Sequence, residues 1–357
     1  MKDVCFQKFA QLVLYWFKYY GRHDLPWKKD TTPYRVWISE VMLQQTRVTT
    51  VIPYFERFVQ QFPTLKILSV ADVDEVLIYW SGLGYYARAH NLHRTAQIIY
   101  KQYHGKFPTT IEKLTALPGI GRSTAGAILS FGMHRYAVLL DSNVKRVLSR
   151  YFDLNVLPKN ANGINLLWSL AKKCTPQKHC WDYNQAIMDL GAIVCTRVPK
   201  CLICPLQDSC FSYQKNTHQI KSLVEKPKRN RLQKKSIYLI VLQNFQGHIF
   251  LEKRPLTGIW GGLWSFPECP VNVENLELWC HIRFNIDSTT KIEWWNPFLH
   301  KLSHLILEIN PILLKSYTKD SYILAEDKSE IWYKDNFSLP GGIAAPIARL
   351  IRQLKQK

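Results

Sequence analysis

Residues 109–132 read TTIEKLTALPGIGRSTAGAILSFG, two short helical patterns around a Pro-Gly-Ile-Gly turn. The pattern predicts a helix ending near Leu117 and a second beginning near Arg122. The turn glycines, Gly119 and Gly121, let the backbone approach a neighbour closely, and the amides at the start of the second helix can point toward a phosphate. An ordinary connection between antiparallel helices is the alternative. The LPGIG sequence followed by an arginine favours contact with a DNA backbone in a helix-hairpin-helix arrangement.

The rest of the chain predicts a multidomain protein. Apolar residues recur at helical spacing up to about residue 213, so we expect an all-α domain over 1–213. Residues 214–235 carry eight Lys or Arg against one Glu, which indicates a basic linker; it could lie near a polyanion or be a solvated tether. Over 236–357, the runs SIYLIVLQ and HIFLEKR around the turn NFQG predict a β-hairpin, and IAAPIARLIRQLKQK predicts a helix. This part should form an α+β domain.

Charge and length point to a partner class. The 357 residues carry a formal net charge of +20, a balance typical of proteins that bind nucleic acid. Near the N-terminus, the apolar stretch between Lys8 and Lys18 is too short to span a bilayer, and it lacks a cleavage site of small residues. We therefore expect no signal peptide, no membrane partner and a cytoplasmic, nucleoid-associated protein.

The segment 195–210, CTRVPKCLICPLQDSC, has the spacing Cys-x5-Cys-x2-Cys-x5-Cys. Disulfides would need an oxidising compartment that nothing else in the sequence indicates. Zinc commonly binds four thiolates but usually through two separated Cys-x2-Cys pairs, and this segment has one. The spacing favours an iron–sulfur cluster. Its four candidate ligands are Cys195, Cys201, Cys204 and Cys210.

Glu40 is a candidate acid. No other charge lies between Arg35 and Arg47, and three of the four side chains one helical turn from Glu40 are apolar. A carboxyl on an apolar helix face is desolvated, so its pKa should rise toward neutrality, where it can deliver a proton. An exposed glutamate on a curved helix is the alternative.

Asp141 is a candidate partner for Glu40. It ends the apolar run YAVLLD and precedes the amphipathic stretch SNVKRVLSRY, so it should lie at a helix N-cap. Capping alone would explain an aspartate there. Paired carboxyls would suit cleavage of a glycosidic bond, one protonating the leaving group and the other stabilising a sugar cation. The substrate would then be a nucleoside in DNA.

Six segments in order resemble the MutY family of adenine DNA glycosylases, in the helix-hairpin-helix superfamily related to endonuclease III. The matching segments are LPW at 25–27, WISEVMLQQT at 37–46, GLGYYARA at 82–89, LPGIGRSTA at 117–125, LDSNVKRVL at 140–148 and the cysteine loop. The resemblance spans nearly the whole chain. It implies a monomer that removes adenine opposite 8-oxoguanine or guanine from duplex DNA and holds one [4Fe-4S] cluster. Glu40 matches the acid, and Asp141 the carboxylate that stabilises or captures the sugar cation.

Further residues take expected roles from the same resemblance. The endonuclease III branch has a Schiff-base lysine where this chain has Ser123; a hydroxyl forms no imine, so the enzyme should be monofunctional. Gln44 and Tyr85 match positions that enter the base stack. Without the resemblance, a surface glutamine and core packing of the tyrosine would be the simpler interpretations. Arg197 and Lys200 are expected to contact phosphate.

The C-terminal part resembles the MutT-like, or Nudix-like, domain of the same family through 254–268 and 301–309. It lacks the clustered carboxylates of a Nudix helix, so pyrophosphate hydrolysis is not expected. The resemblance implies that Ser303 and His304 recognise 8-oxoguanine; a polar turn is the alternative. Leu302 stands where the family commonly has Phe, which predicts weaker discrimination between 8-oxoguanine and guanine.

Two other functions stay open on the sequence. One is a thymine-mispair or oxidised-pyrimidine glycosylase of the same superfamily, which would preferably lack residues 236–357 and carry lysine at position 123. The other is a catalytically inactive DNA-binding protein. A second departure from the family concerns the cluster: five residues separate Cys195 from Cys201, where six are usual.

Overall fold

The computed structural model describes most of the chain in six stretches. These are residues 3–154, 160–215, 232–285, 290–315, 329–334 and 339–356. Most of the predicted linker, residues 216–231, lies outside them. The chain forms two compact units, Met1–Val70 with Asn91–Lys228 and Ala71–His90 with Arg229–Lys357. No helix among the described residues is long and apolar enough to cross a membrane.

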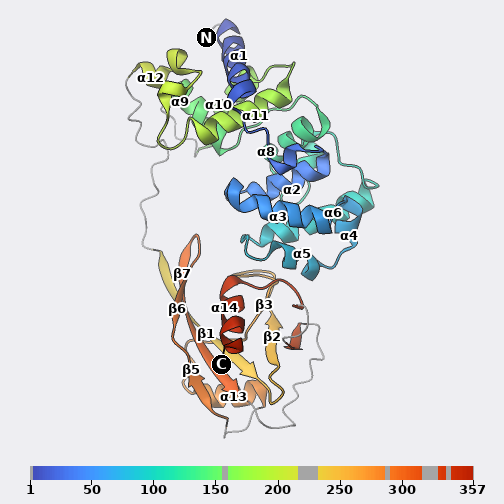
Figure 1. Ribbon diagram of the computed structural model, residues 1–357, viewed down its shortest axis with the longest axis vertical. Coiled ribbons are helices and arrows are strands. Elements are labelled where there is room, and N and C mark those ends of the chain that lie inside the picture. The colour runs from blue at the N-terminus through green and yellow to red at the C-terminus, as the bar shows by residue number, and fades with distance from the viewer. Residues whose placement is uncertain are drawn as a thin grey trace. The chain divides into compact units, whose positions relative to one another are not determined.

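The first unit is helical, as predicted (Figure 1). Its helices are α1 (Asp3–Tyr20), α2 (Pro33–Leu43), α3 (Val48–Gln61), α4 (Leu65–Val70), α6 (Ala87–Gln102, which begins in the second unit), α7 (Ile111–Thr115), α8 (Arg122–Ala127), α9 (Ser142–Tyr151), α10 (Ala161–Cys174), α11 (Cys180–Ile193) and α12 (Phe211–Gln214). Four of them, α1, α9, α10 and α11, contribute to one apolar core that includes Phe9, Val13, Leu148, Tyr183 and Leu190. This core holds the N-terminus of α9 in place, and with it Asp141.

The predicted hairpin of helices is present. Helix α7 ends at Thr115 and α8 begins at Arg122, within two residues of the expected bounds. Gly119 has a φ of +76°, and a Cβ on it would lie 3.0 Å from the Cβ of Asn91. The turn therefore requires glycine both for its backbone conformation and for its close approach to α6.

The second unit is built on one sheet. Its strands are β1 (Gln233–Gln243), β2 (Ile249–Lys253), β3 (Trp264–Ser265), β4 (Glu268–Cys269), β5 (Ile292–Trp294), β6 (Phe298–Lys301), β7 (Leu305–Lys315) and β8 (Glu330–Tyr333). The order is β3-β2-β1-β7-β5, with β4 on β1, β6 on β7 and β8 on β2. Strands β1 and β2 are antiparallel, which confirms the predicted hairpin, and β1 is parallel to β7.

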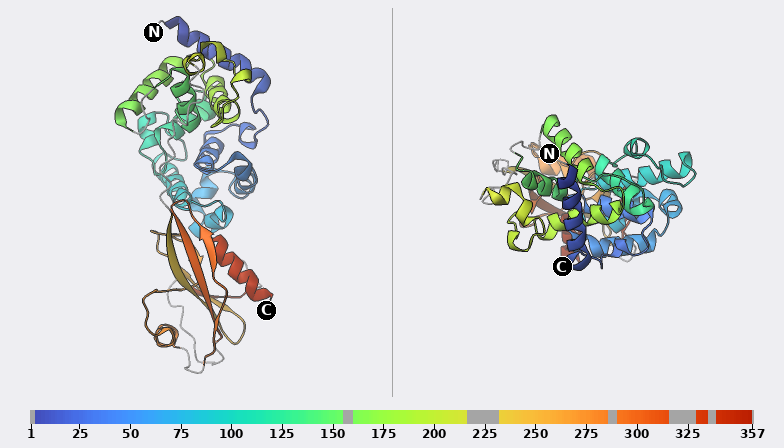
Figure 2. Two further views of the ribbon diagram at one scale, coloured as in Figure 1. Left: turned by 90° about the vertical axis from the view of Figure 1, so that its left-hand side faces the viewer. Right: turned by 90° about the horizontal axis from the view of Figure 1, so that it is seen from above.

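Helices cover this sheet on both faces. Ile240 and Leu242 of β1 pack with Cys280 and Phe284 of α13 (Leu276–Phe284). Because alternate residues of a strand face opposite sides, their buried neighbours Leu239 and Val241 face the other side. Helix α14 (Ala345–Lys355), the predicted C-terminal helix, lies on the opposite side of the sheet from α13 (Figure 2). The α+β prediction is confirmed.

Candidate active site

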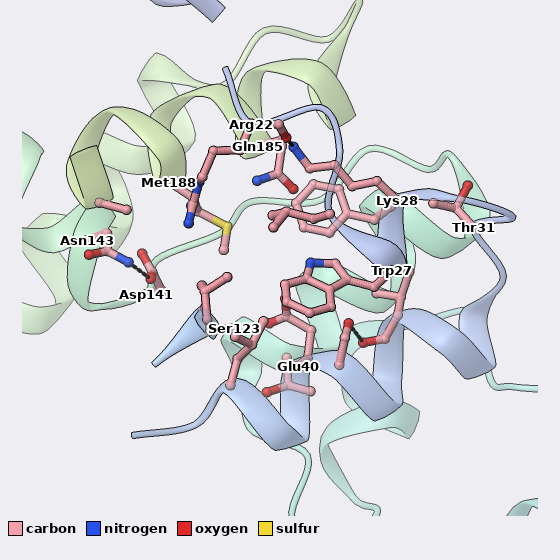
Figure 3. A pocket seen from close by; sticks show the side chains of 18 of the residues that line it. Arg22, Trp27, Lys28, Thr31, Glu40, Ser123, Asp141, Asn143, Gln185 and Met188 are labelled. Carbon is pink, nitrogen blue, oxygen red and sulfur yellow. Dashed lines mark hydrogen bonds between the residues drawn. The ribbon is translucent and has the colours of Figure 1, made fainter. Parts of the chain in front are cut away.

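A cavity of about 740 Å³ lies in the first unit and brings the two predicted carboxyls together (Figure 3). Glu40 comes from the last turns of α2, and Asp141 from the N-cap of α9. Ser123, at the start of α8, lines the same cavity. Residues a hundred positions apart in the chain therefore share one site.

The Glu40 carboxyl has surroundings that favour its neutral form. Burial raises its pKa to about 8, and the negative charge of Asp141 acts in the same direction. Among the described residues, none donates a hydrogen bond to this carboxyl or forms an ion pair with it. A pKa raised this far favours the protonated form of Glu40 at neutral pH.

The Asp141 carboxyl differs from that of Glu40 in that hydrogen bonds stabilise its ionised form. One oxygen accepts from the Val144 amide at 2.8 Å, and the other from Asn143 Nδ2 at 2.8 Å. Burial raises the pKa of Asp141, whereas these hydrogen bonds and the positive charge of Arg146 act against the rise. The predicted N-cap is confirmed. Of the two carboxyls, Asp141 is the one whose ionised form accepts hydrogen bonds from the described residues.

Helix α9 also joins Asp141 to the cysteine loop. Arg146 donates to the side chain of Asn143 at 2.9 Å and to the carbonyl of Cys195 at 2.7 Å. The buried Arg150 donates to the carbonyl of Thr196 at 2.6 Å and to Cys195 Sγ at 3.4 Å. Arg146 therefore links Asn143, and through it Asp141, to the loop, and Arg150 adds a second connection between α9 and the loop.

Three polar side chains complete this part of the cavity. The Ser123 hydroxyl is buried and has no hydrogen-bond partner within the described part of the chain. The Gln44 amide lies 3.5 Å from Thr124 Oγ1 and is half-buried. Its neighbour Gln45 is exposed, lines the cavity and has a φ of +58°. Gln45 was not predicted as a site residue, because nothing in the pair QQ reveals which side chain turns outward.

One wall of the cavity was not predicted from the sequence. Asp189 of α11 is fully buried and accepts from Arg22 Nε and from Gln185 Nε2, each at 3.0 Å. Lys28 Nζ lies 3.6 Å from the same carboxylate, and Trp27 lines the cavity beside it. The sequence offered one signal for this wall: the charged Asp189 stands between the apolar residues Met188 and Leu190 of α11. Arg22 and Lys28 are more than 150 residues away, so spacing could not identify them.

The four predicted cysteine ligands line one small cavity of about 40 Å³. Burial raises the pKa of Cys204 to about 12, and the charges of the other three cysteines add to the rise. Thiols this close need a positively charged centre to be thiolates together. Within the described residues, no group of His, Cys, Asp or Glu side chains has the geometry to hold a single metal ion.

Two predicted recognition sites, Tyr85 and the pair Ser303–His304, lie in the second unit. None of these three residues lines the large cavity, as far as the described residues show. Tyr85 is 43% exposed with a φ of +51°, and the Arg88 guanidinium lies 5.3 Å from its ring centroid. Ser303 and His304 are exposed at the tip of the β6–β7 hairpin, closed by a 2.9 Å bond from the Leu302 amide to the carbonyl of Leu305. The hairpin turn presents both side chains outward.

Comparisons with known proteins decide the family. Residues 38–173 match the HhH-GPD superfamily of base excision DNA repair proteins, and 238–353 match a NUDIX domain. An adenine DNA glycosylase of Buchnera aphidicola subsp. Baizongia pistaciae is 42% identical over 98% of this chain and 97% of its own. The chain belongs to the adenine DNA glycosylases.

A second relative agrees with this assignment, and two solved structures resemble part of the chain. The adenine DNA glycosylase of Buchnera aphidicola subsp. Schizaphis graminum is 40% identical over 97% of this chain and 99% of its own. Among solved structures, a thermostable thymine-DNA glycosylase superimposes with a TM-score of 0.54 at 29% identity, covering 58% of this chain and 95% of its own. An endonuclease III–DNA covalent intermediate has a TM-score of 0.52 at 20% identity, covering 61% of this chain and 99% of its own; it shows the fold alone.

This adenine DNA glycosylase is therefore a DNA-binding hydrolase of base excision repair, as predicted. The helix-hairpin-helix fold followed by a Nudix-like domain is confirmed. The four thiols that line the small cavity are the ligand type that iron–sulfur clusters use, and Arg150 lies 3.4 Å from one of them, Cys195 Sγ.

Proposed function

We propose that this adenine DNA glycosylase hydrolyses the N-glycosidic bond of adenine paired with 8-oxoguanine or guanine in duplex DNA, and leaves the strand intact. One observation carries the proposal: Glu40 and Asp141 line one cavity, where burial raises the pKa of Glu40 to about 8, whereas Asp141 accepts two hydrogen bonds that stabilise its anion. A proton donor and an anion are what departure of a base from a sugar requires.

In the proposed reaction, Glu40 donates its proton to N7 of a flipped adenine. The bond between N9 and the sugar then breaks, and both of its electrons leave with the base. The positive charge left on the sugar is stabilised by the Asp141 carboxylate. A water molecule adds to the sugar carbon and returns a proton to Glu40, so the products are free adenine and an abasic site.

The second wall of the cavity provides the groups that would hold the base. Trp27 offers an aromatic face, and Gln185 and Lys28 offer hydrogen-bond donors. Asp189 fixes Gln185 by a 3.0 Å hydrogen bond and carries the charge that offsets Lys28. Burial lowers the pKa of Lys28, and the Asp189 carboxylate opposes that change.

Strand cleavage is not part of the proposal, because Ser123 supplies a hydroxyl where a lyase needs an amine. For entry into the base stack, Tyr85 is exposed as the proposal requires. Between the two glutamines, the exposed Gln45 is better placed than Gln44, whose amide is near Thr124. Gly119 and Gly121 are proposed to lie against the DNA backbone.

We further propose that Cys195, Cys201, Cys204 and Cys210 hold one [4Fe-4S] cluster. Each thiolate of such a cluster binds a different iron, so the sulfurs lie further apart than around one zinc ion, where each is about 2.3 Å from the metal. The cluster would stabilise the loop and, through Arg146 and Arg150, the helix that carries Asp141.

The remaining roles rest on the family and on exposure. Ser303 and His304 are proposed to recognise 8-oxoguanine, with Leu302 weakening the discrimination; Arg197 and Lys200 are proposed to contact phosphate. All but the half-buried Leu302 are exposed. We propose that the enzyme acts as a monomer on nucleoid DNA in the cytoplasm.

The test is single-turnover reaction on a duplex with one adenine opposite 8-oxoguanine, labelled on the adenine strand and analysed with and without hot alkali. We expect cleavage only after alkali treatment, and its loss in Glu40→Gln. Glu56→Gln, the same change at an exposed residue of α3, is the matched control and should react normally. Nicking without alkali, or no loss of adenine, would contradict the proposal.

A further inference from the structure

The segment that carries Tyr85 belongs to the unit of the C-terminal sheet. Residues Ala71–His90 lie in sequence between two parts of the helical unit, yet they form one compact unit with Arg229–Lys357. The segment contains α5 (Val73–Trp80), the turn with Tyr85 and the start of α6. Gly84 and Tyr85 both have left-handed backbone conformations, with φ of +77° and +51°. A tyrosine rarely adopts this conformation unless its surroundings impose it.

One ion pair holds the beginning of α5. Lys253 Nζ of β2 donates to Asp74 Oδ2 at 2.7 Å, and the two side chains are 25% and 19% exposed. The other oxygen of Asp74 is buried and has no hydrogen-bond partner among the described residues. Lys253 is therefore the main compensation for the Asp74 charge, and reversing either charge should separate the two elements.

Two polar contacts hold the ends of the turn. The Ile343 amide donates to Ser81 Oγ at 3.3 Å, just before the turn. After the turn, His90 Nε2 lies 3.1 Å from the carbonyl oxygen of Gly261. A Cβ at Gly342 would lie 2.7 Å from the Cβ of Leu77, so the chain near residue 342 lies against α5 with no space for a side chain.

We propose that these contacts form a latch, made of Asp74, Lys253, Ser81 and His90, that positions Tyr85 as part of the 8-oxoguanine recognition domain. The members of the latch are positioning residues and do not touch the substrate. The inference rests on the proposed roles of Tyr85 and of the Ser303–His304 hairpin. Tyr85 and this hairpin then act as one recognition unit, so loosening the latch lowers the preference for 8-oxoguanine over guanine.

The first measurement is hydrogen exchange of the full-length protein without DNA. In Asp74→Lys and in Lys253→Asp, amides 82–86 should exchange faster than in the parent. The double variant reverses both charges, restores the pair and should return exchange to the parental rate. Lys215→Asp is the matched control, because it breaks a 2.7 Å pair with Asp153 in the other unit. If amides 82–86 exchange at the parental rate in both single variants, the ion pair does not hold this turn and the proposal of a latch is wrong.

The second measurement is single-turnover excision of adenine opposite 8-oxoguanine and opposite guanine. The ratio of the two rate constants should fall about tenfold in each single variant and recover in the double variant, with the thermal midpoint of the double variant near that of the parent. A ratio that stays parental while exchange rises would overturn the positioning role. If the parent excises adenine from neither duplex, the proposed function fails, and hydrogen exchange still decides whether the latch exists.

Discussion

The large cavity and the β6–β7 hairpin present their candidate functional side chains in opposite environments. Glu40 and Asp141 line the cavity, where burial raises the pKa of both carboxyls and hydrogen bonds to Asp141 act against the rise there. Ser303 and His304 are exposed, and the turn alone sets their direction. Chemistry that depends on a protonation state needs a buried site, because burial shifts the pKa of a carboxyl. Recognition of a base edge in DNA needs an exposed side chain. Changes in the cavity should therefore abolish the reaction, and changes in the hairpin should only shift the preference between base pairs.

The largest effect is expected from Glu40→Gln. The amide keeps the shape of the side chain but cannot donate an acid proton, so single-turnover excision should fall about a thousandfold. Binding of the mispaired duplex, measured by fluorescence anisotropy, should stay within about twofold of the parent. Excision within tenfold of the parental rate would show that the acid lies elsewhere.

Asp141→Asn should slow excision by about a hundredfold, because it removes the anion proposed to stabilise the sugar cation. Asparagine is as good an N-cap as aspartate, so the thermal unfolding midpoint should hardly change. Rate and midpoint measured on the same preparation separate the two roles. A large fall in the midpoint with a normal rate would leave Asp141 only its capping role.

The pH dependence of excision tests the cavity alone, because it depends on the pKa of Glu40. If Glu40 is the acid, as proposed, it acts in its protonated form; since its pKa is raised to about 8, excision should fall about tenfold per pH unit above pH 8. In Asp141→Asn this alkaline limb should move to lower pH, because the neighbouring negative charge that helps raise the Glu40 pKa is gone. If the alkaline limb of the pH profile is unchanged in Asp141→Asn, the group that controls the loss of activity is not Glu40.

Ser303→Ala with His304→Ala should reduce the preference for 8-oxoguanine over guanine by about tenfold, since two exposed hydrogen-bonding groups are lost. Excision opposite guanine should remain near the parental rate. Comparing the two duplexes under single-turnover conditions measures the preference directly. Equal losses on both duplexes would contradict a role in reading the opposite base.

The smallest effect is expected from Leu302→Phe, which adds an aromatic ring beside the hairpin tip. The preference for 8-oxoguanine should rise about threefold, a typical gain from one stacking contact. The same pair of duplexes provides the measurement. If both mispairs are already discriminated as strongly with Leu302 as with Phe, the leucine does not weaken recognition.

Local signals in the sequence predicted much of this structure. The LPGIG turn, the cap at Asp141 and the β1–β2 hairpin depend on neighbouring residues, and all three are present. The wall around Asp189 could not be predicted, because Arg22 comes from the other end of the unit. The grouping of Ala71–His90 with the C-terminal sheet depends on packing between distant segments, and the sequence pattern carries no sign of it.

The central claim is that the cavity keeps Glu40 protonated at neutral pH. Carboxyl titration by infrared difference spectroscopy, the parent minus Glu40→Gln, would isolate this one group. We expect the protonated carboxyl band to persist through pH 7 and to disappear with a midpoint near 8. A midpoint at the ordinary value for glutamate, about 4.3, would contradict the claim and leave the reaction without its acid.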